Sequence, residues 1–169
     1  MRAVGLAAVA GALLVLPATA LAEGRARGPI DVHPGKNAIN KALARADSGD
    51  TIRIHTGHYR ESLIVGKRVK LVAAKGDEPP VIDGRCRTGI VIAVRAPGVL
   101  LRGLTVIGAD EGFGSAPIGV DFNGVGQGTA RGLTVKNTCG EEVEYGINVF
   151  GSRRISVVNN VTRGFTDAG

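Results

Sequence analysis

Hydrophobic residues along most of this chain fall in short β-branched runs, separated by glycine or asparagine, and these runs recur. One phrase reads Arg-Gly-Leu-Thr-Val, or Arg-Arg-Ile-Ser-Val in its last copy, and it occurs at 102–106, 131–135 and 153–157. A second phrase, built on Gly and Ile, occurs at 89–92, 117–120 and 146–149. Copies of the second phrase follow one another at steps of 28 and 29 residues, and Ala168-Gly169 is interpreted as the start of a fourth copy, with Gly169 23 residues after Gly146. This repeat predicts a parallel β-helix, a solenoid in which every coil supplies several strands.

The aligned copies also predict which side chains face the core. Alternate residues of a strand point to opposite faces, so one face of each run should form a column of stacked aliphatic side chains. Three inward columns are expected: Ile90, Ile118 and Ile147; Ile92, Val120 and Val149; and, on a second wall, Leu104, Leu133 and Ile155. The alternate positions are expected to point outward.

Residues 37–46 are predicted to form a short N-terminal capping helix. Asn37 is the expected cap residue. The apolar face of this helix comprises Ala38, Ile39, Ala42, Leu43 and Ala46. A β-helix has an open apolar end, and an amphipathic helix laid across it removes that end from water. The first full strand is expected to follow at 51–54.

The N-terminal residues predict export. Arg2 precedes an apolar, uncharged run at 3–16, and Ala20-Leu21-Ala22 is a small-x-small cleavage pattern. We therefore predict a signal peptide at 1–22, a linker at 23–29 and a β-helix domain at 30–169. The apolar run is short for a membrane span, so we expect a secreted protein, extracellular or periplasmic, with no stable membrane insertion after cleavage. Because the sequence stops where a further strand should begin, the domain is expected to be truncated at its C-terminal end.

The composition says more about the class of binding partner than about the fold. The chain has 26 glycines and 4% aromatic residues, a mixture typical of tight bends around a core of small aliphatics. Its formal net charge of +6 favours anionic partners. An exported protein rarely meets nucleic acid, so an acidic polysaccharide or another anionic envelope polymer is the expected partner.

Several motifs in chain order resemble the right-handed parallel β-helix superfamily. They are the helix with Ala-Leu, then Gly49-Asp50-Thr51-Ile52, Gly57-His58-Tyr59-Arg60-Glu61, Val81-Ile82-Asp83-Gly84 and the Gly-Ile and Asn-Asn coils. That superfamily includes pectate-lyase-like and pectin-esterase-like proteins and the periplasmic NosD-type repeat proteins. The resemblance extends over residues 30–169. It implies an all-β, right-handed parallel β-helix with a short N-terminal capping helix, and it leaves the activity open.

Arg102, Arg131 and Arg153 occupy equivalent places in the three Arg-containing phrases. Strands of successive coils lie ~4.8 Å apart, so three stacked guanidinium groups would attract anions such as carboxylates, sulfates or phosphates. We predict substrate binding along these arginines. The alternative is a solvated face whose arginines are neutralised by acidic loops of the protein itself.

Acidic residues also recur in corresponding loops, and Glu144 aligns with Asp167 one coil later. Stacked carboxylates suit Ca²⁺, which in pectate lyases bridges enzyme and uronate. Glu144 and Asp167 are therefore the weak candidates for a metal site. The alternative is that these loop acids are solvated and pair with the arginines, so no cofactor is required.

The two cysteines, Cys86 and Cys139, are candidates for a disulfide in an oxidising compartment. Counting along the repeat places them two coils apart, which means ~10 Å between their backbones. This exceeds the ~7 Å limit for a disulfide. We therefore expect a bridge only if a loop folds back.

Catalytic constellations are sparse, and the catalytic residues are unknown. His55 and His58 are spaced like metal ligands but need not point the same way, and Asp121 is the one outward acid of its strand, with Ala93 and Phe150 expected beside it. Two functions stay open. One is a protein that binds an acidic polysaccharide and, in complete form, cleaves or epimerises it. The other is a non-catalytic envelope module, or a NosD-type accessory protein.

Overall fold

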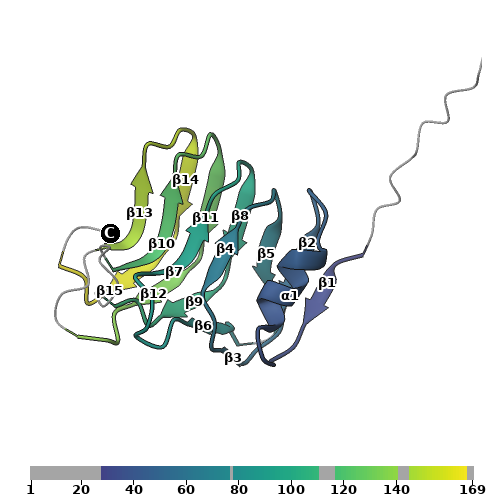
Figure 1. Cartoon of the computed structure of the whole chain (residues 1–169), viewed down its shortest axis with the longest axis horizontal. Coiled ribbons are helices and arrows are strands. Elements are labelled where there is room, and N and C mark those ends of the chain that lie inside the picture. Colours follow the sequence, from purple (N-terminus) through teal and green to yellow (C-terminus); the bar gives the residue numbers. More distant parts are fainter. Residues whose placement is uncertain (1–27, 77, 111–116, 141–144, 167–169) are drawn as a thin grey trace, which may run out of the picture.

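The computed structural model describes residues 28–76, 78–110, 117–140 and 145–166. The predicted signal peptide, at 1–22, and most of the linker lie outside these ranges, as do Glu144 and Asp167. Within them the chain winds into a stack of coils, with the helix α1 (Ala38–Arg45) at the N-terminal end of the stack (Figure 1). No helix of the described part is long and apolar enough to cross a membrane.

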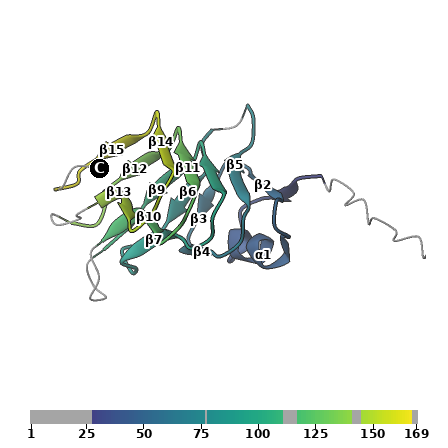
Figure 2. The ribbon, with the colours of Figure 1, turned by 90° about the horizontal axis from the view of Figure 1, so that it is seen from above.

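Each coil contributes strands to three parallel sheets, which we call sheets A, B and C. Sheet A comprises β1 (Ile30–Val32), β2 (Thr51–Ile54), β5 (Lys70–Ala73), β8 (Val99–Arg102), β11 (Gly128–Arg131) and β14 (Ile155–Val158). Sheet B comprises β3 (His58–Tyr59), β6 (Val81–Asp83), β9 (Thr105–Ile107), β12 (Thr134–Lys136) and β15 (Val161–Arg163). Sheet C comprises β4 (Leu63–Val65), β7 (Ile90–Val94), β10 (Ile118–Asn123) and β13 (Tyr145–Phe150). The predicted parallel β-helix is confirmed, and Figure 2 shows the stack from above.

The core lies between the three sheets and is built from columns of stacked aliphatic side chains. In sheet A, Ile52, Leu71, Leu101 and Ala130 stand in register on successive strands, and all are fully buried. The intervening positions point outward, as the two-residue period of a strand requires. Burial of these aliphatics in every coil supplies the main favourable term for folding.

The corners between sheets differ in length. Four residues join sheet C to sheet A in every coil, at 66–69, 95–98, 124–127 and 151–154. The corners from sheet B to sheet C, which we call BC corners, have three, six, ten and eight residues, at 60–62, 84–89, 108–117 and 137–144. The longest corners are therefore BC corners. The corners from sheet A to sheet B have two or three residues except for the seven at 74–80, and the corners from sheet C to sheet A keep one length.

The helix is capped by side chains from the coil beneath it. The carboxylate of Glu61, which is buried, accepts hydrogen bonds from the backbone N–H groups of Ile39 and Asn40, both at 3.0 Å, and from Asn40 Nδ2 at 2.8 Å. At the other end, Lys67 Nζ donates to three of the last carbonyl groups. A negative group at the N-terminus and a positive one at the C-terminus complement the helix dipole.

The predicted helix at 37–46 is thus confirmed, but Asn37 does not cap it with its side chain. Asn37 lies at the N-cap position in a left-handed conformation, with φ of 51°, and makes no side-chain cap hydrogen bond. The cap is tertiary because Glu61, far along the sequence, satisfies the free amides. Sequence position alone does not indicate such a cap.

The last coil has a different register from the predicted one. Ile147 stacks on Val120, two positions away from the predicted partner Ile118. Because two residues is a full strand period, the inward face is preserved. Ile155 stands opposite Gly128 in sheet A, whereas the prediction stacked it on Leu133. The reason is spatial: Gly128 has no side chain, and a Cβ there would contact the ring of Phe122 and the Cδ1 of Ile155.

The last described coil presents apolar side chains to solvent. The exposed large hydrophobic residues of its strands are Val149, Phe150, Val157, Val158 and Val161. Among the described residues, β13, β14 and β15 each pair on one side only.

Candidate functional site

A column of outward side chains runs along sheet A at the exit ends of its strands. Registered pairing places six residues in this column, from β1 to β14: Asp31, Arg53, Val72, Arg102, Arg131 and Val158. We call it the arginine column. Adjacent strands lie ~4.8 Å apart, so neighbouring members stand side by side.

Arg102 and Arg131 form the centre of the arginine column. They are direct register partners on β8 and β11, and both are exposed. The residues that follow, Gly103 and Gly132, have φ of 70° and 61°, so each strand turns away from sheet A directly after its arginine. Two of the three arginines thus stack as expected, and substrate binding along them stays a prediction.

The charge of these two arginines is not balanced locally. Within the described ranges, neither Arg102 nor Arg131 has an ion-pair partner. None of the strands β2, β5, β8, β11 and β14 contains an aspartate or a glutamate. Two adjacent, solvated guanidinium groups on strands without acidic residues favour an anionic ligand that contacts both of them.

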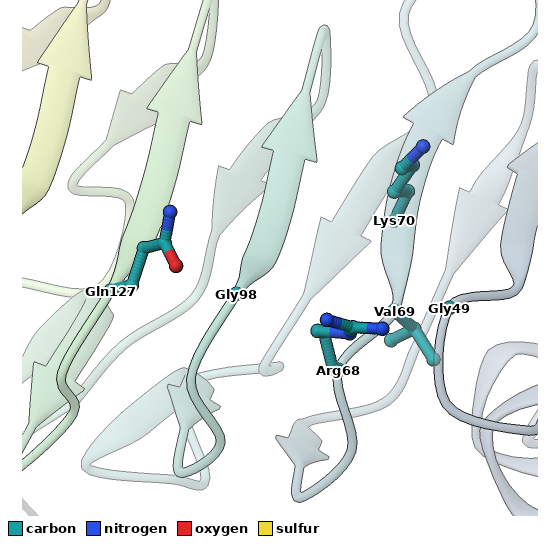
Figure 3. Close-up of a pocket in the computed structure, with 6 residues that line it drawn as sticks. All are labelled: Gly49, Arg68, Val69, Lys70, Gly98 and Gln127. Atoms are coloured by element: carbon teal, nitrogen blue, oxygen red, sulfur yellow. The ribbon is translucent and has the colours of Figure 1, made fainter.

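A shallow depression of roughly 360 Å³ lies at the entry ends of the same strands. Figure 3 shows its lining residues, which are Gly49, Arg68, Val69, Lys70, Gly98 and Gln127. Gly98 has φ of 74°, and a Cβ there would lie 2.7 Å from Arg68 Cδ, so the missing side chain leaves room for Arg68. Strands of four residues separate this depression from the arginine column by ~13 Å. Cationic side chains therefore lie at both ends of the sheet A strands: Arg68 and Lys70 where a strand begins, and Arg102 and Arg131 where strands end.

Asp31, the first member of the arginine column, contacts His55. The sequence did not predict this pair. Asp31 Oδ1 lies 2.9 Å from His55 Nε2 and 3.5 Å from the guanidinium of Arg53. The hydrogen bond from His55 lowers the pKa of Asp31, and the charge of Arg53 adds to this effect. The ring of His33 stacks on that of His55 with centroids 4.3 Å apart. The pairing of β1 with β2 creates this group, and β1 was not predicted as a strand.

Arg153 does not belong to the arginine column, and its prediction as a third stacked arginine is wrong. The residue opposite Arg131 is Val158. Arg153 lies in the corner before β14, where its backbone N–H donates to Val125 O. The phrase at 153–157 looks like the two earlier copies, but it follows the second copy after only 22 residues, whereas the paired strands β11 and β14 are 27 residues apart in sequence. Arg153 therefore lies in the corner before β14.

Cys86 and Cys139 form a disulfide, with Cα atoms 5.4 Å apart. The expected separation of ~10 Å, which assumed that both cysteines follow the regular coil, was wrong. Both cysteines lie in BC corners, outside the stacked strands. Arg85 and Cys86 have left-handed backbones, with φ of 62° and 50°, and the N–H of Cys86 bonds to Gly108 O of the next coil. The loop folds back toward its neighbours, which was the condition for a bridge. A disulfide is consistent with an oxidising compartment, extracellular or periplasmic.

The candidate calcium ligands, Glu144 and Asp167, lie outside the described residues. Among the residues that the structure does describe, no group of three or more histidine, cysteine, aspartate or glutamate side chains is arranged to hold a metal ion. His55 and His58 bind different acids, Asp31 and Asp83.

Asp121 and Asn160 have structural roles. Asp121 is almost fully buried, pairs with Arg95 at 2.8 Å and accepts a hydrogen bond from Asn148 Nδ2. The strand pairing places Asn148 beside Asp121, where the sequence predicted Phe150. Asn160 accepts from Leu133 N and donates to Ala130 O, so it satisfies the backbone of a bend.

The comparisons with known proteins bear on the fold. No protein-family model matches the sequence, and no curated protein matches it. Among solved structures, the chain is similar to the PL6-family alginate lyase AlyGC, in a structure of an arginine-to-alanine mutant, with a TM-score of 0.60 and 17% sequence identity. The match covers 84% of this chain and 21% of the lyase chain, so this chain spans about a fifth of the length of that enzyme. At this identity the likeness shows the parallel β-helix fold that the sequence motifs resemble.

Proposed function

We propose that this protein is exported and binds an acidic polysaccharide along the outer face of sheet A. The observation that carries the proposal is the exposed, in-register pair Arg102 and Arg131 on strands that contain no acidic residue. The structural likeness to an alginate lyase supports the same class of ligand, since alginate is a polymer of uronates.

The geometry suits a linear polyanion better than a small one. The arginine column follows the axis of the stack, across the strands, and the depression at Arg68 and Lys70 lies on the same sheet. Successive carboxylates of one polymer chain would contact successive guanidinium groups, each with paired N–H donors. Because every such contact is exposed, binding should weaken as salt screens it.

Charge reversal of one arginine tests this proposal. Arg131→Glu places a carboxylate beside Arg102, and we expect its retention in an affinity gel that contains alginate or polygalacturonate to fall by about tenfold or more. Arg163→Glu is the matched control, because it makes the same charge change at an exposed site on sheet B. Equal retention of the wild type and of Arg131→Glu would refute the proposal, as would an equal loss in both variants.

A second candidate is a lyase or epimerase reaction on uronates, and the pair of Asp31 and His55 beside Arg53 favours it. In such a reaction Arg53 would hold the substrate carboxylate while His55 accepts the proton from the adjacent carbon. In a lyase the bond from the neighbouring carbon to the glycosidic oxygen then breaks and a carbon–carbon double bond forms. In an epimerase a proton returns from the opposite face.

The two candidates differ in one assay. A lyase generates the ultraviolet absorbance of an unsaturated uronate, an epimerase changes the uronate ratio, and a binding module does neither. We expect the chain of 169 residues to bind without catalysis. Product formation that His55→Gln abolishes, with gel retention unchanged, would replace this expectation by the enzymatic function.

A further inference from the structure

We propose that the first BC corner holds a second anion site, which takes a compact, doubly charged tetrahedral oxyanion, the chemistry of a sulfate or phosphate group. A depression of roughly 390 Å³ lies between the turn before α1 and the ends of β3 and β6. It is lined by Gly35, Lys36, Asn37, His58, Arg60 and Arg85. This site is separate from the arginine column of sheet A.

The cations of this depression come from three separate segments of the chain. Lys36 lies in the turn before α1, Arg60 directly follows β3, and Arg85 follows β6. All three are exposed, and within the described residues none of them takes part in an ion pair. No acidic residue lines the depression. Three like charges around one hollow repel one another unless an anion lies between them.

Asp83, at the rim, positions two of the lining residues. Its Oδ2 lies 2.8 Å from His58 Nε2, and its Oδ1 accepts a hydrogen bond of 2.7 Å from the backbone N–H of Arg85. Arg85 has φ of 62°, an unfavourable value for arginine, and the disulfide at Cys86 holds the next residue. The backbone of Arg85 is therefore held in place by the fold.

The charge around the depression favours a multivalent anion. Lys36, Arg60 and Arg85 line it and no acidic residue does. The nearby carboxylates already have partners: Asp83 binds His58 and the N–H of Arg85, Glu61 binds the first amides of α1, and Asp31 binds His55 and Arg53. On sheet A the guanidinium groups form a line on an open surface, which suits repeated single charges along a polymer. Here the cations surround one depression, which suits one group with several oxygen atoms, and guanidinium contacts sulfate and phosphate through paired N–H donors.

The test uses the arginine Nε–Hε resonances of the intact, oxidised protein in two-dimensional NMR. Sodium sulfate or sodium phosphate is titrated against sodium chloride at equal ionic strength. Arg85→Asn removes the guanidinium while asparagine tolerates the left-handed backbone. Arg154→Asn is the matched control, because Arg154 is also exposed, has φ of 55° and lies at a different corner. Arg60→Gln is a second variant, which leaves the loop of the disulfide unchanged.

We expect saturable shifts of the Arg60 and Arg85 resonances with sulfate or phosphate and none with chloride. Arg85→Asn and Arg60→Gln should each weaken binding by about fivefold or more, and Arg154→Asn by less than about twofold. Shifts that rise linearly without saturation, or that are equal in Arg154→Asn and Arg85→Asn, would overturn the proposal.

The source of the oxyanion is decided in the same titration with a monosaccharide sulfate. Binding that is tighter than that of inorganic sulfate assigns the site to a sulfated glycan, and equal binding assigns it to the free ion. The uronate site on sheet A and the oxyanion site can be refuted separately. Arg85→Asn should keep its retention on the uronate gel, and Arg131→Glu should keep its affinity for sulfate.

Discussion

At the N-terminal end of the stack, α1 covers the first coil, and Glu61 and Lys67 bind the two ends of that helix. At the other described end, strands β13 to β15 expose apolar residues such as Phe150, whose side chain is two-thirds exposed. Strand pairing in all three sheets joins these last strands to the stack, and the disulfide adds a covalent link nearby, because Cys139 follows β12 and its partner Cys86 follows β6.

The contrast shows two ways to hold the end of a solenoid. A helical cap removes apolar surface from water, but it requires polar partners that fix the helix in place. A disulfide covers nothing, yet it limits how far the distal coils can separate in the unfolded chain. In a solenoid each coil contacts only its neighbours, so the two ends should respond independently to substitution.

The largest effect is expected from removal of the disulfide. A bridge that closes 53 residues of sequence stabilises by about 4 kcal/mol in the chain-entropy model. The double variant Cys86→Ser with Cys139→Ser should lose about this much in urea denaturation. Hydrogen exchange should increase most in β12 to β15 and least in α1. An equal increase in α1 would contradict the independence of the two ends.

A smaller effect is expected at the cap. Glu61→Gln keeps the shape of the side chain but replaces one acceptor oxygen by an NH₂ group that faces N–H donors. We expect a loss of about 2–3 kcal/mol, with faster hydrogen exchange confined to α1 and the first coil. Glu78→Gln is the control, because Glu78 is exposed, and it should change stability by less than about 0.5 kcal/mol. Equal losses in both variants would show that Glu61 does not cap the helix.

The smallest effect concerns Tyr59, whose buried hydroxyl donates to Val32 O and His55 O and so joins the first strands. Tyr59→Phe should cost about 1–2 kcal/mol at neutral pH. Burial, with a contribution from the charge of Glu61, raises the pKa of Tyr59 to about 12 from 10.0.

A raised pKa means that the folded state favours the neutral phenol. The stability linked to this shift is complete below pH 10 and is lost as the pH rises toward 12. Urea denaturation at neutral pH and at about pH 11 should therefore show a smaller alkaline loss in Tyr59→Phe than in the wild type. The same alkaline loss in both proteins would assign it to other groups.

The sequence predicts the fold well because the physical requirements of a β-helix are periodic. Columns such as Ile92 over Val120 follow from the two-residue strand period and from the repeat. The sequence pattern misplaces the last coil because the phrase at 153–157 resembles the earlier copies, whereas the strand pairing places residues 155–158 opposite residues 128–131. The Glu61 cap lies 21 and 22 residues from the amides that it binds, so no local pattern reveals it.

The candidate site was predicted only where it is periodic. Arg102 and Arg131 occur in the regular copies of the repeat, and they stack as expected. The pair of Asp31 and His55 depends on β1, a strand of three residues before the helix. The depression lined by Lys36, Arg60 and Arg85 depends on the left-handed backbone of Arg85. The disulfide depends on the same loop, which folds back toward its neighbours. These features arise from corners whose path the repeat does not specify.

The unequal corners have a consequence for how such a protein can diverge. Every corner from sheet C into sheet A has four residues, whereas the BC corners range from three to ten. Codons gained or lost at a BC corner would change what its loop presents to solvent and leave the spacing of Arg102 and Arg131 intact. One side of the molecule can therefore vary freely between descendants while the opposite side keeps a fixed pitch.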